Sequence, residues 1–554
     1  MEKVWIKNYQ PGVPVEINPD RYASLNDIFE ETCRVYQKRP AFVNMGKVLS
    51  FATLEEKTRG FASFLQTELG LRKGDRIAVM LPNILQYPIA MFGAMRAGLI
   101  VVNVNPLYTP RELELQLKDS GAVAIVVLAN FAHALEKARP KTVIRHVIVT
   151  ELGDLFFYPK SCIINWVVKN IKKLVPKWSI PGHIKFSHVL KIGRQLTYIN
   201  PKLTGEDIAF LQYTGGTTGR TKGAILTHRN MLANLEQAGV WIKSVIKPGE
   251  EIMITALPLY HIFSLTANCL TYFIVGGLNV LITNPRDISG FIKELRQYKF
   301  TAITGVNTLF NALLNHPDFI HLNFNYLKIT LGGGMAVQKA VADRWKTVTH
   351  VPLLEAYGLT EASPAVCINP LNLKEFNGSV GLPIPSTEIS IRDENEQELG
   401  VNQAGELWVR GPQVMKGYWQ LPEETADALR NNWLRTGDIA TIDQEGYIRI
   451  VDRKKDTIVI SGFNVYPNEV EDVIAMMKGV LEVAVVGVED TAGERVKAFI
   501  VPRDPNITKV AIIAHCREYL TGYKVPKEIE FRTELPKTNV GKILRRALKE
   551  NVIH

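Results

Sequence analysis

Cysteine pairs, long apolar runs and clustered charge are scarce in this sequence, and each absence excludes a class of protein. The five cysteines (Cys33, Cys162, Cys269, Cys367 and Cys516) form no CxxC pair. This argues against a disulfide framework or a zinc site and favours a reducing cytosol. No stretch reaches the roughly 18 uninterrupted apolar residues of a membrane-spanning helix. Residues 1–22 contain acids and prolines, so we expect no secretory signal peptide.

The formal net charge of +10 raises the question of a nucleic-acid partner. No basic cluster with interleaved aromatic residues accompanies that charge, so we expect no nucleic-acid binding. An anionic substrate or an anionic membrane surface fits the charge equally well.

A length of 554 residues predicts roughly two to four domains. Short apolar runs alternate with helical patterns up to about residue 310, which predicts α/β layers with largely parallel strands. Short alternating strands follow from about residue 388, and a small α+β unit closes the chain. The strand-like runs of the first part are 76–81, 124–128, 146–150, 209–214, 279–283 and 301–306.

Residues 213–223, YTGGTTGRTKG, combine four glycines with a lysine, Lys222. They follow the strand-like run AFLQYT and precede the helical pattern THRNMLANLEQ. A glycine-rich loop in that place can turn backbone N–H groups toward an anion. It is not a Walker loop, because Lys222 precedes a glycine and alanine follows. Phosphate binding and a flexible surface loop both remain open at this point.

Four further stretches are weak singly. EAYGLTEAS (355–363) offers Tyr357 for stacking on a base and Glu361 as a ligand of a hard metal ion. WLRTGDIATID (433–443) places Asp438 after a glycine, where it can bind ribose hydroxyls or form an Asx-turn. VDRKKDTIVISGFNVYPNEVE (451–471) is charged at its start, and LPKTNVGKILRRAL (535–548) carries Lys542 before a basic helix. Each could equally be a solvated surface segment.

Together and in this order, the five stretches resemble the core motifs of the acyl-adenylate-forming superfamily. Within it, the sequence is similar to the bacterial long-chain fatty acid CoA ligases over essentially the whole chain. Residues 431–455 match the fatty acyl-CoA synthetase signature, with Asn432 where glycine is usual. The other similar stretches are NPDRY (18–22), NVNPLYTPRELE (103–114), ALPLYHIF (256–263), FNVYPNEVEDVI (463–474) and NVGKILRR (539–546).

The resemblance implies an enzyme that activates a fatty acid with ATP, releases pyrophosphate, and passes the acyl group to coenzyme A. It places that activity in fatty acid degradation (β-oxidation) and lipid metabolism. The implied catalytic residues are Lys542, Glu361 and Thr214, of which Thr214 and Glu361 would also hold Mg²⁺. The implied ATP- and AMP-binding residues are Tyr213, Thr214, Gly215, Gly216, Thr217, Thr218, Gly219, Lys222, Gly333, Gly334, Glu355, Ala356, Tyr357, Gly358, Leu359, Thr360, Asp438, Arg453 and Lys542.

The same resemblance implies the adenylate-forming enzyme fold. A large domain (1–451) with an acyl tunnel and a β-rich subdomain would be joined by a hinge (452–456) to a small mobile α+β domain (457–554). The hinge residues are Asp452, Arg453, Lys454 and Lys455, and Gly462, Phe463 and Asn464 would line the coenzyme A side. His261 would lie at the acyl gate. Residues 301–314 and 331–335 suit the tunnel wall, or an ordinary core.

Three other functions are weighed against this one. An acyl-AMP ligase could deliver the acyl group to a carrier protein, and a luciferase-type oxidase is a more distant variant. A catalytically inactive ATP- or lipid-binding protein would not need Glu361, Asp438, Arg453 and Lys542 together. A homodimer is one possible assembly.

Residues 162–178, CIINWVVKNIKKLVPKW, read as a basic amphipathic helix. At about 100° per residue, one face gathers isoleucines, valines and a leucine, and the opposite face gathers four lysines. Such a helix can lie in a membrane interface, or its apolar face can pack on the protein's own core. The first interpretation predicts a cytoplasmic protein peripherally associated with the inner face of the cytoplasmic membrane.

Overall fold

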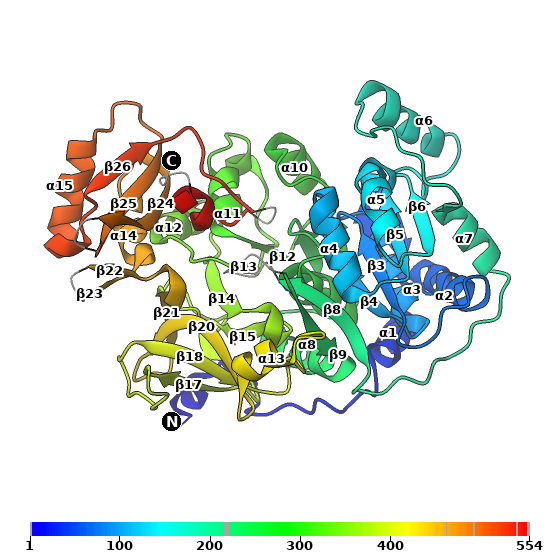
Figure 1. Ribbon diagram of the computed structural model, residues 1–554, viewed down its shortest axis with the longest axis horizontal. Helices are drawn as coiled ribbons and strands as arrows, with labels where there is room; N and C mark the ends of the chain where they lie inside the picture. The colour runs from blue at the N-terminus through cyan, green and yellow to red at the C-terminus, as the bar shows by residue number, and fades with distance from the viewer. Residues whose placement is uncertain (1–2, 215–220, 461–462, 491–492, 539–540, 551–554) are drawn as a thin grey trace.

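The computed structural model describes residues 3–214, 221–460, 463–490, 493–538 and 541–550. A large domain forms most of the molecule, and a small domain at the C-terminal end of the chain lies against one end of it (Figure 1). The large domain contains two mainly parallel sheets and a third, antiparallel sheet. This is the α/β architecture that the alternating sequence pattern predicts.

The first sheet has seven strands and is parallel except at its last strand. It contains the predicted runs 76–81, 124–128, 146–150 and 209–214. Their apolar side chains, such as Ile77, Val79 and Val126, are fully buried, because helices cover both faces of a parallel sheet. In spatial order the strands are β7 (Ile184–Lys185), β6 (His146–Thr150), β5 (Ala124–Leu128), β3 (Arg76–Met80), β4 (Ile100–Asn103), β8 (Ile208–Thr214) and β9 (Lys222–Thr227).

The second sheet has nine strands, with a parallel centre and antiparallel strands at both edges. Parallel strands end at one edge of a sheet, and ligands bind at that edge in such folds. Here Gly333 and Ala356 lie opposite each other at the carboxyl ends of two neighbouring strands. The strands are β16 (Leu382–Pro383), β15 (Ala365–Ile368), β14 (Leu354–Gly358), β13 (Ile329–Gly333), β12 (Ala302–Gly305), β10 (Ile252–Thr255), β11 (Leu278–Leu281), β1 (Pro40–Asn44) and β2 (Lys47–Ser50).

Helices connect the strands of these two sheets. They are α1 (Leu25–Val35), α2 (Phe51–Thr67), α3 (Gln86–Arg96), α4 (Pro110–Ser120), α5 (Ala132–Ala138), α6 (Lys160–Trp166), α7 (Phe186–Gly193), α8 (His228–Ile242), α9 (Thr271–Ile274), α10 (Ile288–Leu295), α11 (Asn307–Leu314) and α12 (Lys339–Thr349).

The third sheet is the predicted β-rich region after residue 388. Its strands are β17 (Glu388–Arg392), β18 (Gly405–Arg410), β20 (Trp433–Ile442), β19 (Leu429–Arg430) and β21 (Ile448–Arg453), and α13 (Pro422–Ala428) precedes β19. The antiparallel register of β20 and β21 sets Asp438 directly opposite Arg453. Backbone pairing of β20 and β21 therefore holds Asp438 and Arg453, which belong to different sequence motifs, side by side.

The small domain is a sheet with helices and has its own apolar core, which includes Val465, Val485 and Ile500. Its strands are β23 (Phe463–Val465), β22 (Ile458–Ile460), β25 (Gly493–Pro502), β24 (Val480–Asp490) and β26 (Glu528–Phe531). Its helices are α14 (Pro467–Ala475), α15 (Lys509–Tyr519) and α16 (Arg545–Glu550). The predicted small α+β unit is present.

The glycine-rich stretch differs from the prediction on one side. A strand, β9, follows it and pairs antiparallel with β8, so that Thr214 lies opposite Lys222. The predicted helical pattern over 227–237 coincides with α8, which begins at His228 after the N-cap Thr227. The prediction omitted β9, which separates the glycine-rich stretch from that helix. The apolar run 224–226 is buried mostly in the sheet, which is why strand pairing prevails over a direct loop-to-helix connection.

The predicted helix over 162–178 is shorter than expected. Helix α6 continues as a π-helical turn, Val167–Ile171, and ends before Lys172. Lys173 has a positive φ of 51°, and Pro176 cannot continue a helix. Within the described residues, no helix is both long and apolar enough to cross a membrane.

The alternative that this segment packs on the protein's own core holds only at its C-terminal end, where Val175 and Trp178 are half-buried and pack against an apolar core cluster. No residue of α6 or of the π-helical turn is buried. Ile163, Trp166 and Ile171 are 57–58% exposed, and the preceding Phe157 and Tyr158 are 80% and 85% exposed. The segment projects from the edge of the large domain (Figure 1).

Candidate active site

One cavity of about 2340 Å³ collects almost all of the predicted site residues that the structure describes. It lies at the carboxyl ends of β8, β13 and β14, and residues of β20, β21 and the small domain also line it. The predicted residues in its wall are Tyr213, Thr214, Lys222, His261, Gly333, Gly334, Glu355, Ala356, Tyr357, Gly358, Leu359, Thr360, Glu361, Asp438, Asp452, Arg453, Lys454, Lys455 and Lys542.

Two groups of predicted residues are not among these. Gly215, Gly216, Thr217, Thr218, Gly219 and Gly462 lie outside the described residues. Phe463 and Asn464 are exposed on β23, where the Phe463 ring stacks on Tyr523 with centroids 5.1 Å apart. In this orientation of the small domain they face solvent.

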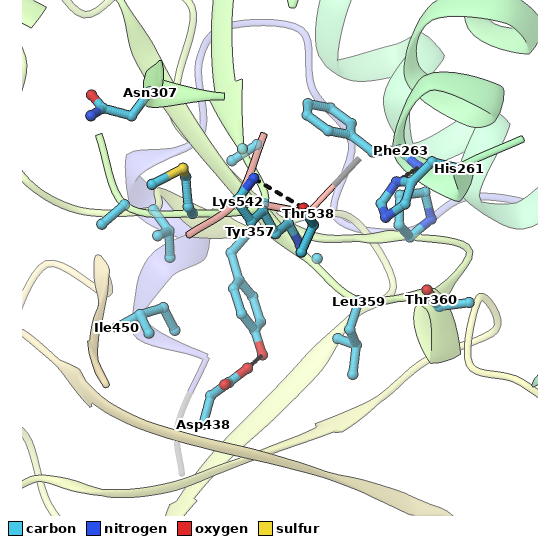
Figure 2. A pocket seen from close by; sticks show the side chains of 18 of the residues that line it. His261, Phe263, Asn307, Tyr357, Leu359, Thr360, Asp438, Ile450, Thr538 and Lys542 are labelled. Carbon is cyan, nitrogen blue, oxygen red and sulfur yellow. Dashed lines mark hydrogen bonds between the residues drawn. The ribbon is translucent and has the colours of Figure 1, made fainter. Parts of the chain in front are cut away.

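Asp438 and Tyr357 form a polar pair at the floor of the cavity (Figure 2). The Tyr357 hydroxyl donates to Asp438 Oδ2 over 2.6 Å, and Arg453 Nε lies 3.6 Å from Asp438 Oδ1. Burial raises the pKa of Asp438, and the Arg453 charge opposes that rise. Burial and the Asp438 charge raise the pKa of Tyr357 well above its ordinary value, so its hydroxyl stays a hydrogen-bond donor.

Lys542 reaches into the cavity from the small domain (Figure 2). Its side chain packs over Gly334, where an added Cβ would lie 3.0 Å from Lys542 Cε. Its backbone N–H donates to Thr538 Oγ1 over 3.1 Å. Burial lowers the pKa of the ammonium to about 8, Arg453 acts in the same direction, and Asp438 opposes. Burial disfavours the charge of the Lys542 ammonium, so an anion that binds beside it relieves that cost.

Glu361 and Thr214 supply hard oxygen atoms to the same cavity. The Tyr418 hydroxyl donates to Glu361 Oε1 over 2.7 Å, and Lys222 Nζ lies 5.1 Å from the centre of the Tyr418 ring. Tyr418 thus positions two predicted site residues. Among the described residues, no cluster of three or more acidic, histidine or cysteine side chains could hold a metal. A carboxylate and a hydroxyl still fit Mg²⁺, which takes one or two carboxylates plus phosphate oxygens.

His261 is a neutral residue of the cavity wall. Burial lowers its pKa to about 3, and the Lys542 charge acts in the same direction. Its Nδ1 accepts the Phe263 N–H over 3.4 Å. An imidazole with that pKa is a poor proton acceptor near neutral pH, which agrees with a structural position at the acyl gate.

Glu355 lies deeper in the wall, on β14. Its Oε1 accepts the Val337 N–H over 2.8 Å. Burial raises its pKa to about 8, with a further rise from Asp472 of the small domain. The carboxyl group therefore carries a proton near neutral pH and can donate one hydrogen bond into the cavity.

The hinge is held by a network around Arg545 of α16. Arg545 Nη1 lies 3.1 Å from Asp452 Oδ1, and Nη2 lies 2.8 Å from Glu471 Oε2. Asp452 Oδ2 also accepts the Asn468 N–H, in the first turn of α14, over 2.8 Å. An acidic side chain at a helix N-terminus is favourable, so the hinge carboxylate is tied to the small domain at two points.

Of the two interpretations of residues 301–314, the structure favours an ordinary core over an apolar tunnel wall. The residues of this segment that line the cavity are polar, namely Thr304, Asn307, Thr308 and Asn311. Its large apolar side chains, including Phe310 and Leu313, are packed in a core cluster instead. The apolar part of the cavity is lined by Ala238, Ile242, Met253, Tyr272, Ile329, Leu331, Ile368 and Leu371.

Sequence reasoning missed Tyr418 and Arg545. Tyr418 follows Gly417 with no motif around it that points to Glu361, and Arg545 is one of two adjacent arginines in a basic helix. Their partners lie 57 and 93 residues away in the chain. Local patterns hold no signal for such pairs.

Comparisons with known proteins agree with this geometry. Residues 29–419 match the family model described as AMP-binding enzyme, and residues 469–542 match the AMP-binding enzyme C-terminal domain. The long-chain-fatty-acid–CoA ligase of Yersinia pestis is 59% identical over 554 residues, covering 100% of this chain and 99% of that protein. The enzyme of the same name from Escherichia coli O157:H7 is 59% identical over 551 residues, covering 99% and 98%.

Solved structures give the same picture. An anthranilate CoA ligase, AuaEII, in complex with anthranoyl-AMP has a TM-score of 0.84 at 25% identity, covering 97% of this chain and 98% of that one. ATP-bound MatB from Rhodopseudomonas palustris has a TM-score of 0.79 at 25% identity, covering 95% and 98%. The two-domain fold is therefore of a kind already seen with nucleotides bound.

Proposed function

The chain belongs to the AMP-binding enzyme family, and we propose that it is a long-chain-fatty-acid–CoA ligase that forms an acyl-AMP intermediate. The observation that carries the proposal is the meeting of Lys542 with Asp438, Arg453 and Glu361 in one cavity. ATP, coenzyme A and a fatty acid are the substrates. The product would enter fatty acid degradation through β-oxidation and lipid metabolism.

ATP would bind along the carboxyl ends of the strands. We propose that Thr214, Lys222 and the glycine-rich loop contact the β- and γ-phosphates, with Thr214 and Glu361 as the protein ligands of Mg²⁺. Gly333, Gly334 and residues 355–359 would surround the adenine, with Tyr357 against its ring. Asp438 and Arg453 would bind the ribose hydroxyls, and their fixed register on β20 and β21 supports that role.

In the first step a fatty acid carboxylate oxygen attacks the α-phosphorus of ATP. A carboxylate–phosphorus bond forms, the bond to the bridging oxygen breaks, and pyrophosphate leaves. Two anions must meet, so the barrier falls if a cation lies where they meet. Lys542 is placed to do this, and one preorganised donor of this kind is typically worth about 3–4 kcal/mol.

In the second step the coenzyme A thiol attacks the acyl carbonyl, a thioester forms and AMP leaves. We propose that the small domain first rotates about residues 452–455, withdrawing Lys542 and bringing residues 462–464 to the cavity. The exposure of Phe463 and Asn464 in the present orientation supports two alternating faces.

One assay tests the reaction. Purified protein is incubated with ATP, magnesium, palmitate and coenzyme A, and the products are separated. We expect palmitoyl-CoA, AMP and pyrophosphate. ADP as the nucleotide product would contradict the adenylate route, and acyl-AMP without thioester would favour transfer to a carrier protein.

We also propose peripheral contact with an anionic membrane at the inner face of the cytoplasmic membrane. Exposed apolar side chains, among them Phe157, Tyr158 and Trp166, lie beside Lys169, Lys172 and Lys173, which matches the apolar and anionic layers of a lipid surface. Binding to vesicles containing anionic lipid should weaken at high salt. Binding that survives replacement of the three lysines by glutamine would exclude this segment as the contact. The homodimer stays a prediction, for which sedimentation is the test.

A further inference from the structure

Helix α11 contacts the small domain next to Lys542. The Thr308 hydroxyl donates to the Gly541 carbonyl oxygen over 2.9 Å, and the Asn311 amide donates to the Leu481 carbonyl oxygen over 3.2 Å. Thr308 belongs to the first turn of the helix. Its hydroxyl crosses the domain interface to reach the residue directly before Lys542.

Close packing surrounds the backbone at this contact. Gly541 has a φ of +86°, and an added Cβ would lie 3.0 Å from Thr308 Oγ1 and 3.2 Å from Val306 Cγ2. On the other side of the lysine, Gly334 leaves room for Cε and Nζ of Lys542. The hydroxyl of Thr308 therefore restrains the backbone at Gly541, from which the Lys542 side chain extends into the cavity.

We infer that Thr308 is a positioning residue for Lys542, and that the hydrogen bond to Gly541 sets the depth to which the ammonium enters the cavity. Asn311 supports the same docking from the next turn of α11. The inference rests on the proposed function, because it assigns Thr308 to the first of the two steps. Misplacing a catalytic group by about 1 Å can cost a large rate factor, so a contact that adds little stability can still govern that step.

The contact belongs to one orientation of the small domain. Rotation would carry the Gly541 carbonyl away, and Thr308, which lines the cavity, would then be open to water. Loss of the hydroxyl should therefore slow acyl-AMP formation and leave thioester formation from acyl-AMP unchanged. A threonine that merely stabilised α11 would affect both steps alike.

Thr308→Val tests this inference, because it keeps the branched shape and removes the donor. A hydrogen bond contributes about 0.5–1.5 kcal/mol, so we expect acyl-AMP formation to fall about threefold to tenfold. Coenzyme A transfer from synthetic palmitoyl-AMP should not change. Thr308→Ser should restore the first step. Thr347→Val is the control, since Thr347 lies exposed on α12 and its hydroxyl bonds to Asp343 in its own helix.

The same change made in a Lys542→Ala background separates positioning from any direct role. If Thr308 acts through Lys542, Thr308→Val should cause no further loss there. An undiminished loss in that background, equal loss in both steps, or unchanged acyl-AMP formation would each overturn the inference. Failure of the proposed function is distinguishable, because the unaltered protein would then form no acyl-AMP.

Discussion

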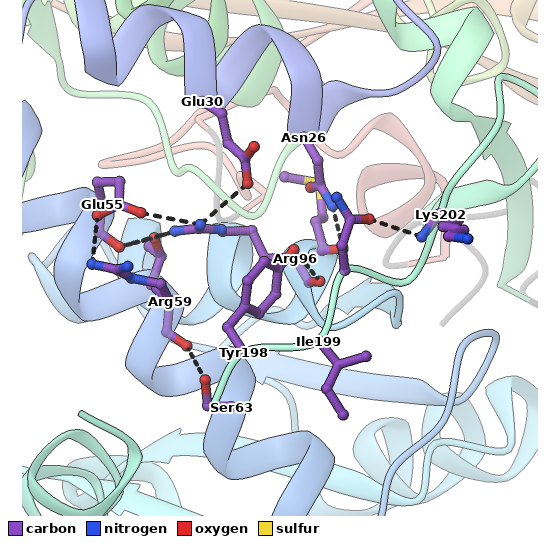
Figure 3. A network of polar contacts seen from close by, with 12 residues as sticks. Asn26, Glu30, Glu55, Arg59, Ser63, Arg96, Tyr198, Ile199 and Lys202 are labelled. Atoms are coloured by element: carbon purple, nitrogen blue, oxygen red, sulfur yellow. Dashed lines mark hydrogen bonds and ion pairs between the residues drawn. The ribbon is translucent and has the colours of Figure 1, made fainter. Parts of the chain in front are cut away.

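Two cationic side chains, Arg96 in the core of the large domain and Lys542 in the wall of the cavity, have different surroundings. Arg96 is 3% exposed, and its Nη2 lies 3.1 Å from the carboxylates of both Glu30 and Glu55 (Figure 3). Its Nη1 donates to Thr58 Oγ1 over 3.1 Å, and the guanidinium lies 4.9 Å from the centre of the Tyr198 ring. This charge is neutralised within the protein and joins helices α1, α2 and α3.

Lys542 has no such neutralisation. Within the described part of the chain, its ammonium has no carboxylate at ion-pair distance, and the nearby Arg453 repels it. The paired cation is a structural element, because the energy of its burial is offset inside the fold. Lys542 has no such partner among the described residues, so the compensating negative charge must come from a ligand. The comparison teaches that partners, and not burial alone, separate a structural charge from a functional one.

The largest effect should come from Lys542→Ala. We expect acyl-AMP formation to slow by on the order of 10²–10³-fold, the typical cost of losing one preorganised donor. Transfer of the acyl group from supplied palmitoyl-AMP to coenzyme A should be largely retained. Stability at pH 7 should not fall, because the substitution removes a desolvated charge. Paired measurements of the two steps check this, and an equal loss in both would contradict it.

Glu361→Gln removes a negative charge from the cavity, as Lys542→Ala removes a positive one. The Tyr418 hydroxyl would still find an oxygen acceptor on the new amide side chain, but the charge that would hold Mg²⁺ would be gone. We expect acyl-AMP formation to fall by on the order of 10²-fold and to recover in part at high magnesium. Titration of the rate with magnesium checks this. A magnesium dependence like that of the unaltered protein would remove Glu361 from the metal site.

The pKa of about 8 for Lys542 predicts a pH dependence of the first step. Its charge is present below about pH 8 and lost above, so kcat/KM for acyl-AMP formation should fall about tenfold per pH unit on the alkaline side. In Lys542→Arg the guanidinium stays charged, so the rate should be lower but that decline should disappear. Its persistence would assign the decline to another group.

The lowered pKa of Lys542 also makes the stability of the protein depend on pH. The pKa of Lys542 is about 8 in the folded protein, against an ordinary value of 10.5. Between these values the unfolded chain binds more protons, so the Lys542 contribution to the free energy of unfolding rises with pH. Denaturant unfolding of the protein and of Lys542→Ala at pH 8 and pH 10 should show this difference.

The smallest effect is expected at the neutralised cation. Glu30 is 43% exposed and shares Arg96 with Glu55. Glu30→Gln should therefore lower the free energy of unfolding by less than about 1 kcal/mol. Both steps should keep their rates. A loss of acyl-AMP formation in this variant would show that the two cations are coupled and would end the distinction drawn between them.

The sequence predicts the strands at the centre of the first sheet because apolar runs in a doubly covered sheet must be buried. Runs such as 124–128 and 146–150 coincide with β5 and β6. The family and the reaction class follow from motif resemblance, and the comparisons confirm both. The individual roles of the site residues stay predictions, although nearly all of those described line one cavity.

The failures have physical causes. The sequence analysis does not predict β9, because this strand forms only by pairing with β8. The helix predicted over 162–178 ends at Ile171 in the structure, because Lys173 has a positive φ and Pro176 cannot continue a helix, and the periodicity took account of neither. Residues 301–314 have the composition of a tunnel wall, but which face of α11 meets the cavity depends on packing. Long-range contacts decide the first and the last of these cases.

Among the described residues, the hydrogen bonds that α11 gives to the small domain end on main-chain carbonyls, those of Gly541 and Leu481. The carbonyl oxygen at position 481 is present whatever side chain that residue bears, whereas position 541 needs glycine, because an added Cβ would lie 3.0 Å from Thr308 Oγ1. The small domain can therefore diverge in sequence over much of its surface while the docking contacts persist, provided that Gly541 and the course of the backbone are kept. Exchange of this domain between related enzymes should preserve these acceptors, which makes the domain a natural unit for recombination.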